Sequence, residues 1–97
     1  MLFRSKIYTK NEIEYCFQTK NSAKHLAARF CAKEAVYKAL SSLGFSEISF
    51  QDCEIINLEN GVPTVVFLNE RFKDVRAKIS LSHSKTTAIA QVVAEMM

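Results

Sequence analysis

The sequence has 97 residues, 48% of them hydrophobic and 24% charged, with two glycines and one proline, which indicates one folded domain over residues 1–97 and excludes a disordered or collagen-like chain. No apolar run approaches the ~20 residues of a membrane-spanning helix, and the N-terminal MLFRSKIYTK lacks the apolar core of a secretory signal, so we expect a cytoplasmic protein without a membrane segment. The net charge is +3, but residues 1–40 carry eight Lys/Arg against three Glu, whereas residues 41–97 carry five against seven acidic residues.

The basic first half is suited to an anionic partner, and charge alone does not choose among a phosphate-rich cofactor, an acidic protein and a nucleic acid. An ordinary solvated surface is the alternative interpretation.

A short helix is predicted from Lys10 to about Thr19. It follows the capping box Thr9-Lys10-Asn11-Glu12, in which the threonine hydroxyl and the glutamate carboxylate satisfy each other's backbone N–H groups. Tyr8, just before the box, is placed to pack on Ile13 as a hydrophobic staple.

A longer helix is predicted from about Ala23 to Leu43, capped by Ser22 and ended by Gly44. Its apolar residues fall in one sector at helical spacing, namely Leu26, Phe30, Val36, Tyr37, Leu40 and Leu43. Lys33 falls inside this sector. Because an unpaired buried ammonium is costly, Lys33 must reach an anion, extend to the edge, or line an open cleft, and we favour the cleft.

After Gly44 the pattern changes to short β-like runs. We expect strands over residues 48–56, 62–68, 77–82 and 86–95, with a turn at Asn60-Gly61 and a loop or single helical turn over residues 69–76. Helices followed by mostly antiparallel strands predict an α+β fold, with the long helix packed across a small sheet.

Four charged residues of the long helix form a candidate site. Arg29, Lys33 and Lys38 place three cations within about two and a half turns around the carboxylate of Glu34. Such a set suits a phosphate together with a metal, because Mg²⁺ takes one or two carboxylates plus phosphate oxygens and waters. On an ordinary helix the Glu34–Lys38 pair is only surface support.

His83 follows a strand end and is flanked by Ser82 and Ser84, where it is placed to act as a base or to hydrogen-bond a phosphate. A surface role is the alternative for a lone loop histidine. His25 has no partner motif, and we interpret it as structural.

Other classes find little support in the sequence. It has no G-x-G-x-x-G, Walker or H-E-x-x-H motif. Cys16, Cys31 and Cys53 form no C-x-x-C pair, so we expect three reduced cysteines without zinc or disulfides. The basic residues lie mainly on predicted helices, which makes nucleic-acid binding a weak alternative.

Two motifs together resemble the holo-acyl-carrier-protein synthase type of 4′-phosphopantetheinyl transferase. AARFCAKEAVYKAL resembles the family's signature helix, and ISLSHSKTTAIAQVV its C-terminal elements, about 45 residues later. IYTKNEIEYC and NGVP also resemble family segments, so the likeness covers nearly the whole chain. It implies an α+β domain of the phosphopantetheinyl transferase type.

The resemblance implies an enzyme that transfers the 4′-phosphopantetheine arm of coenzyme A to a serine of an acidic apo acyl carrier protein. The reaction uses Mg²⁺, releases adenosine 3′,5′-bisphosphate and serves fatty acid biosynthesis and so lipid metabolism. The family's small members are homotrimers with sites between subunits.

Residue roles follow from the same resemblance. Glu34 is implied to bind Mg²⁺, and Glu34, Lys38 and His83 to form the catalytic set. The cofactor would be contacted by residues of the helix, the turn and the last loop, namely Arg29, Lys33, Lys38, Asn60, Gly61, Pro63, Ser82 and His83.

The family normally opens with a G-x-D strand whose aspartate is a second Mg²⁺ ligand, and no residue of this sequence visibly replaces it. Three interpretations stay open. The chain is an active transferase with a reduced metal site, a non-catalytic relative or fragment that binds coenzyme A or a carrier protein, or an unrelated module for an anionic partner such as nucleic acid.

Overall fold

A computed structural model describes residues 6–84 and 86–97 as helices followed by strands. In chain order the elements are α2 Lys10–Phe17, α3 Ser22–Ser42, the 3₁₀ turn η1 Phe50–Asp52, β1 Cys53–Asn57, β2 Pro63–Phe67, the 3₁₀ turn η2 Glu70–Phe72, β3 Val75–His83 and β4 Ala88–Met96. The predicted α+β class is confirmed. No helix within the described ranges is both long and apolar enough to span a membrane.

The helix ends follow from local hydrogen bonds. The predicted capping box is present, with Thr9 N donating to Glu12 Oε1 at 2.9 Å and Glu12 N donating to Thr9 Oγ1 at 3.3 Å. For α3, however, the N-cap is Asn21 and not Ser22, because the Asn21 amide oxygen accepts the Lys24 N–H at 3.3 Å. Gly44 ends this helix as predicted, with the positive φ of 100° that glycine favours.

The strands form two antiparallel hairpins, β1–β2 and β3–β4, and not one continuous sheet. Ile55 pairs with Val65 in the first hairpin, and Ile79 pairs with Val92 in the second. The predicted strand over residues 48–56 was wrong in its first half. There Ser49 and Asp52 cap each other's backbone N–H groups in a local box, which winds the chain into η1 before β1 begins.

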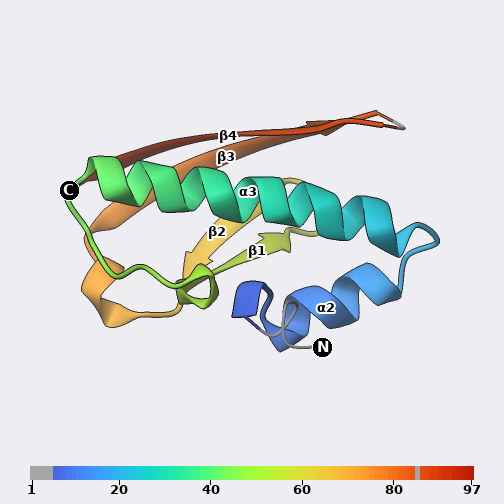
Figure 1. Cartoon of the computed structure of the whole chain (residues 1–97), viewed down its shortest axis with the longest axis horizontal. Coiled ribbons are helices and arrows are strands. Elements are labelled where there is room, and N and C mark those ends of the chain that lie inside the picture. Colours follow the sequence, from blue (N-terminus) through green and yellow to red (C-terminus); the bar gives the residue numbers. More distant parts are fainter. Residues whose placement is uncertain (1–5, 85) are drawn as a thin grey trace.

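Helix α3 runs through the middle of the molecule, between the long β3–β4 hairpin and the layer formed by β1, β2 and α2 (Figure 1). Of its predicted apolar sector, Leu26, Val36 and Leu40 are buried, whereas Tyr37 is 39% exposed. The core between α3 and the strands is made by Ala32, Val36, Leu40, Cys53, Ile55, Phe72 and Val75.

A buried ion pair joins α2 to α3. Lys33 has no exposed surface, and its Nζ lies 2.6 Å from Glu12 Oε1 and donates to the Ile7 carbonyl at 2.8 Å. The second Glu12 oxygen accepts the Ile55 N–H of β1 at 2.8 Å. Lys33 therefore reaches an anion inside the protein, and the preferred interpretation of an open cleft at Lys33 was wrong.

Replacing Lys33 with methionine should lower the free energy of unfolding by about 3–5 kcal/mol, because Glu12 is left as a buried, unpaired carboxylate. The double variant Lys33→Met/Glu12→Gln should be less destabilised than the sum of the two single variants. Urea unfolding measures both. Lys38→Met, at an exposed position of the same helix, is the matched control and should change stability by less than ~0.5 kcal/mol. A Lys33→Met protein as stable as the control variant would contradict the assignment.

Candidate functional site

A cavity of about 180 Å³ lies where α2, α3, the β1–β2 turn and the end of β3 meet. We call it the Arg29 cavity. Its lining combines aromatic, basic and turn residues, namely Tyr15, His25, Ala28, Arg29, Asn57, Gly61, Pro63, Leu81 and His83. Four residues singled out by the sequence, Arg29, Gly61, Pro63 and His83, are thus brought together around one space.

Arg29 is the buried cation of this cavity, with only 3% of its surface exposed. Its Nη2 donates to Asn57 Oδ1 at 2.6 Å, and Asn57 Nδ2 donates to the Gly61 carbonyl at 3.1 Å. The Tyr15 ring lies under the guanidinium, with 4.5 Å between Cζ and the ring centroid. The buried Nε–H finds no hydrogen-bond acceptor among the described residues. Arg29 is therefore a buried cation, incompletely hydrogen-bonded within the described part of the chain, that lines a cavity, which suits an anionic ligand.

The two histidines that line the cavity contact each other. His25 of α3 and His83 of β3 make an edge-to-face contact with ring centroids 6.2 Å apart, and Tyr15 makes a similar contact with His25 at 6.2 Å. Burial lowers the pKa of His25 below its ordinary value, and the neighbouring basic groups of Arg29, His83 and Lys24 lower it further. His25 is therefore neutral at pH 7.

The residues predicted from the turn and the last loop to contact the cofactor differ in their positions relative to the cavity. Gly61 has φ +83°, which its turn requires, and with Pro63 it borders the cavity. The Asn60 amide oxygen accepts the Val62 N–H at 3.1 Å and so shapes the turn. Ser82 is exposed, with its side chain on the other side of β3 from Leu81, because successive strand residues alternate. Neither Asn60 nor Ser82 lines the Arg29 cavity.

Glu34 and Lys38 are both exposed and lie on the outer side of α3. Nine positions separate His25 from Glu34, which places the two side chains about half a turn apart around the helix and about 13 Å apart along it. One chain therefore does not bring the predicted Glu34–Lys38 pair and the Arg29 cavity to the same side of α3.

A metal at Glu34 must draw most of its ligands from elsewhere. No group of three or more His, Cys, Asp or Glu side chains capable of holding an ion occurs in residues 6–84 and 86–97. One exposed carboxylate is a suitable partial ligand for Mg²⁺, which readily keeps waters and takes phosphate oxygens. The residues present fit a metal that binds together with a phosphate-bearing ligand.

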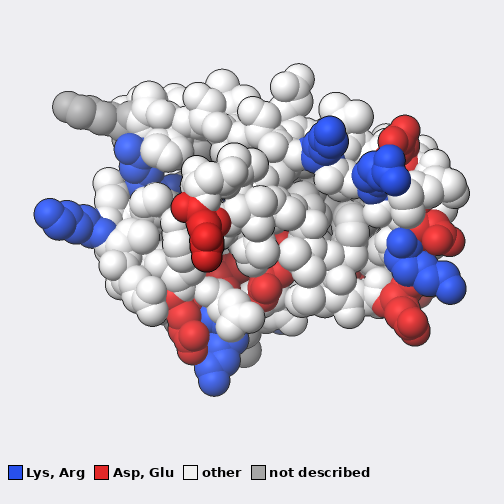
Figure 2. Space-filling model, turned by 180° about the vertical axis from the view of Figure 1, so that it is seen from behind, with Lys and Arg blue, Asp and Glu red and all other residues white. Residues whose placement is uncertain are grey.

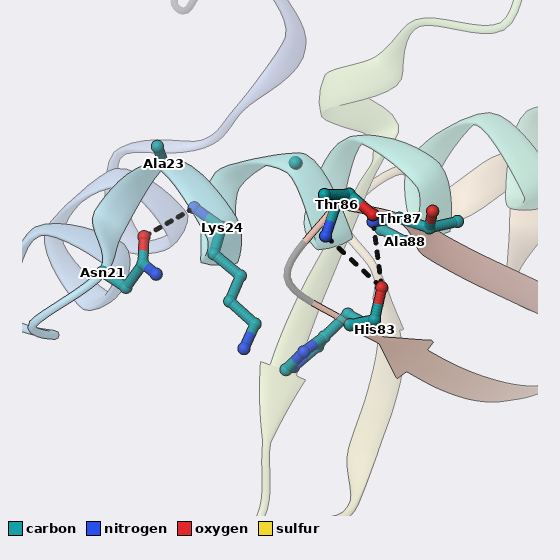
Figure 3. A pocket seen from close by; sticks show the side chains of 9 residues that line it. Asn21, Ala23, Lys24, His83, Thr86, Thr87 and Ala88 are labelled. Carbon is teal, nitrogen blue, oxygen red and sulfur yellow. Dashed lines mark hydrogen bonds between the residues drawn. The ribbon is translucent and has the colours of Figure 1, made fainter.

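A second cavity of about 290 Å³ lies between the start of α3 and the β3–β4 connection. Figure 3 shows Lys24 extending from α3 toward His83, with Thr86 and Thr87 beyond it. Ser84 Oγ accepts the Thr87 N–H at 3.2 Å, so this hydroxyl shapes the connection. Part of the connection, Lys85, lies outside the described residues.

Surface charge is mixed over the face seen in Figure 2, where basic and acidic side chains alternate instead of forming one basic patch. Two cations of the first half, Lys33 and Arg29, are buried and do not contribute to the surface charge. A broad nucleic-acid-binding surface finds no support on this face.

The three cysteines are free, as predicted. Burial raises the pKa of Cys53 to about 11, and it also raises the pKa of Cys16. These two thiols are therefore protonated at neutral pH and are unsuited to act as nucleophiles.

The family model described as the 4′-phosphopantetheinyl transferase superfamily matches residues 2–93. A holo-[acyl-carrier-protein] synthase of Protochlamydia amoebophila is 46% identical over 95 residues, with 94% of this chain and 77% of that protein covered. One of Carboxydothermus hydrogenoformans is 43% identical over 94 residues, with 91% and 75% covered.

Solved structures agree. The Helicobacter pylori holo-[acyl-carrier-protein] synthase in complex with coenzyme A superimposes with a TM-score of 0.82 at 30% identity, covering 98% of this chain and 83% of that one. A Bacillus anthracis holo-(acyl-carrier-protein) synthase gives 0.81 at 35% identity, covering 99% and 82%. The chain therefore belongs to the 4′-phosphopantetheinyl transferase superfamily, and within it to the holo-acyl-carrier-protein synthase type.

Three residues of the Arg29 cavity were missed by sequence reasoning. Asn57 ends β1 and Tyr15 lies in α2, and neither belongs to a motif that the sequence displays. His25 was interpreted as structural, but it lines the cavity and contacts His83. Such contacts between distant elements leave no short-range pattern.

Acid should destabilise the wild-type protein more than the variant His25→Phe. Because the pKa of His25 is lowered by folding, the unfolded chain binds more protons, so the contribution of neutral His25 is present above the ordinary histidine pKa and is lost as the pH falls below it. The drop in Tm between pH ~7.5 and ~5 should therefore be smaller for His25→Phe. Equal drops for the two proteins would count against a lowered pKa.

Proposed function

We propose that the chain transfers the 4′-phosphopantetheine arm of coenzyme A to a serine of an apo acyl carrier protein. The single observation that carries this assignment is the arrangement of charged residues on the helix that resembles the family's signature helix. Glu34 and Lys38 are exposed, and Arg29 lines a cavity that His83 also lines. The family membership supplies the reaction, and these side chains supply suitable chemistry.

Arg29 and His83 would bind the phosphate-rich end of coenzyme A. The guanidinium of Arg29 carries a permanent positive charge at the wall of the cavity, where it would attract phosphate. Gly61 and Pro63, at the other wall of the cavity, would lie near the adenine. Asn60 would act by shaping that turn, and Ser82 is positioned for at most a peripheral contact.

Glu34 and Lys38 would act on the pyrophosphate. Lys38 would stabilise the negative charge that develops on the bridging oxygen. Glu34 is the carboxylate of this chain that would bind Mg²⁺. The ion, when bound, would neutralise charge on the phosphate oxygens. The carrier serine oxygen forms a bond to the β-phosphorus while the bond from that phosphorus to the bridging oxygen breaks. Adenosine 3′,5′-bisphosphate leaves, and the serine proton passes to a base or to water.

The complete site would lie between copies of the chain in a homotrimer. A cofactor held in the Arg29 cavity faces away from the Glu34 side of its own α3, about half a turn apart. A neighbouring copy can present its Glu34 and Lys38 to that cofactor. This supports a site made from two chains.

The carrier partner would be an acidic protein, which the basic residues of the first half suit. We place the reaction in the cytoplasm and in fatty acid biosynthesis, and so in lipid metabolism. A non-catalytic relative that only binds coenzyme A or a carrier is the second candidate. It is favoured because residues 6–84 and 86–97 contain no group of three or more His, Cys, Asp or Glu side chains that could hold a metal ion.

Intact-mass spectrometry of an apo acyl carrier protein, incubated with the chain, coenzyme A and Mg²⁺, should show the gain of one phosphopantetheine arm. Glu34→Gln should lower the rate ~100-fold or more, because a neutral amide binds Mg²⁺ poorly. Glu70→Gln, an exposed change in η2, should leave the rate unchanged. Transfer by Glu34→Gln at the wild-type rate would refute the metal role. Coenzyme A binding without any transfer by the wild-type chain would favour the second candidate.

Mixing two inactive variants tests the shared site. Glu34→Gln and His83→Ala should each be inactive, but after mixing and subunit exchange about one quarter of the interfaces would pair two intact halves. The mixture should thus regain about a quarter of wild-type activity. Activity that stays at the level of the separate variants, with exchange shown by native mass spectrometry, would place the whole site within one chain.

A further inference from the structure

Tyr15 has two contacts that an ordinary surface residue of α2 does not need. It is 38% exposed, yet the face of its ring lies 4.5 Å from the Arg29 guanidinium carbon and it meets His25 edge-on at 87°. The ring therefore contacts two of the three α3 residues that line the cavity, Arg29 and His25. Its removal would free both at once.

Besides the packing around this buried side chain, the Arg29 guanidinium has one hydrogen bond to orient it. The bond from Nη2 to Asn57 fixes one end of its plane, and Nε–H is unpaired. A single hydrogen bond still allows the plane to turn about the bonded nitrogen. The Tyr15 ring restricts that turn by stacking on the guanidinium face.

His83 is exposed at the end of β3 and meets His25 at an interplanar angle of 72°. An exposed imidazole otherwise samples several rotamers. The His25 ring therefore restricts the rotamers of His83, which lines the Arg29 cavity. This ring contact is a direct link between α3 and the end of β3.

His25 acts here through its ring and not through charge. The titratable groups that face it are Tyr15 from α2, Lys24 and Arg29 from its own helix, and His83 from β3. This set of described groups contains no Asp or Glu that would favour a protonated His25. A neutral ring of similar shape should replace it.

We propose that Tyr15 and His25 are positioning residues of the Arg29 cavity, with Tyr15 orienting the Arg29 guanidinium and His25 orienting the His83 imidazole toward the bound cofactor. This inference rests on the proposed function, because the cofactor is taken to be coenzyme A. It adds two residues that do not need to touch the reacting atoms.

Isothermal titration with coenzyme A and steady-state kinetics test the two roles. His25→Ala and Tyr15→Leu should each raise the Kd and KM for coenzyme A by ~3–10-fold, with kcat within ~2-fold of wild type. His25→Phe and Tyr15→Phe keep the rings and should restore values within ~2-fold of wild type. Phe17→Leu, an exposed aromatic change of α2 outside the cavity, is the matched control.

The His83 side-chain resonance, measured without ligand, gives a second readout. It should move on His25→Ala and stay near its wild-type position in His25→Phe, because the neighbouring ring persists. Coenzyme A binding by His25→Ala equal to wild type would overturn the inference, and so would a His25→Phe variant as weak as His25→Ala, since the imidazole itself would then be required. A wild-type chain that binds no coenzyme A would instead overturn the proposed function.

Discussion

The Glu12–Lys33 pair fixes the rotation of α3, and the placement of the site depends on that rotation. Lys33 is enclosed completely and bound at 2.6 Å to a carboxylate that also accepts the Ile55 N–H of β1. A buried pair of this kind tolerates little displacement, since either charge alone would be costly inside the protein. With Lys33 held inward, the next residue, Glu34, must lie about 100° away and face solvent, whereas Arg29, one turn earlier, lies on the inner side.

The two buried cations of α3 differ in how many of their N–H groups have partners. This difference suggests a structural role for Lys33 and a ligand-binding role for Arg29. Lys33 has an ion pair and a carbonyl acceptor, so its role is complete within the fold. Arg29 has one amide acceptor, an aromatic face and a buried N–H without a partner, next to a cavity. An incompletely satisfied buried donor is costly unless a ligand completes it. An anionic ligand in the cavity would therefore complete the interactions of the Arg29 guanidinium.

Most local signals in the sequence were reliable, although the N-cap of α3 is Asn21 instead of Ser22 and the local Ser49–Asp52 box was overlooked, whereas long-range contacts could not be predicted. The capping box at Thr9 and the helix end at Gly44 involve neighbours within a few residues, and both were predicted correctly. The position of Lys33 was recognised as unusual, but its partner lies 21 residues earlier on another helix, so its environment was misjudged. Asn57 and His25 were missed for the same reason, because their partners come from other elements or from a distant point of the chain.

The division of charged groups between two sides of α3 has a physical consequence for catalysis. Glu34 and Lys38 are exposed in the isolated chain, where water screens their charges and weakens their effect on a phosphate. If a second copy covers them, as proposed, water is excluded and the same charges interact much more strongly with the phosphate. The cofactor, held by Arg29 of one chain and Lys38 of the next, then becomes part of the contact between copies. Assembly and cofactor binding should therefore stabilise each other, because each supplies surface that the other needs.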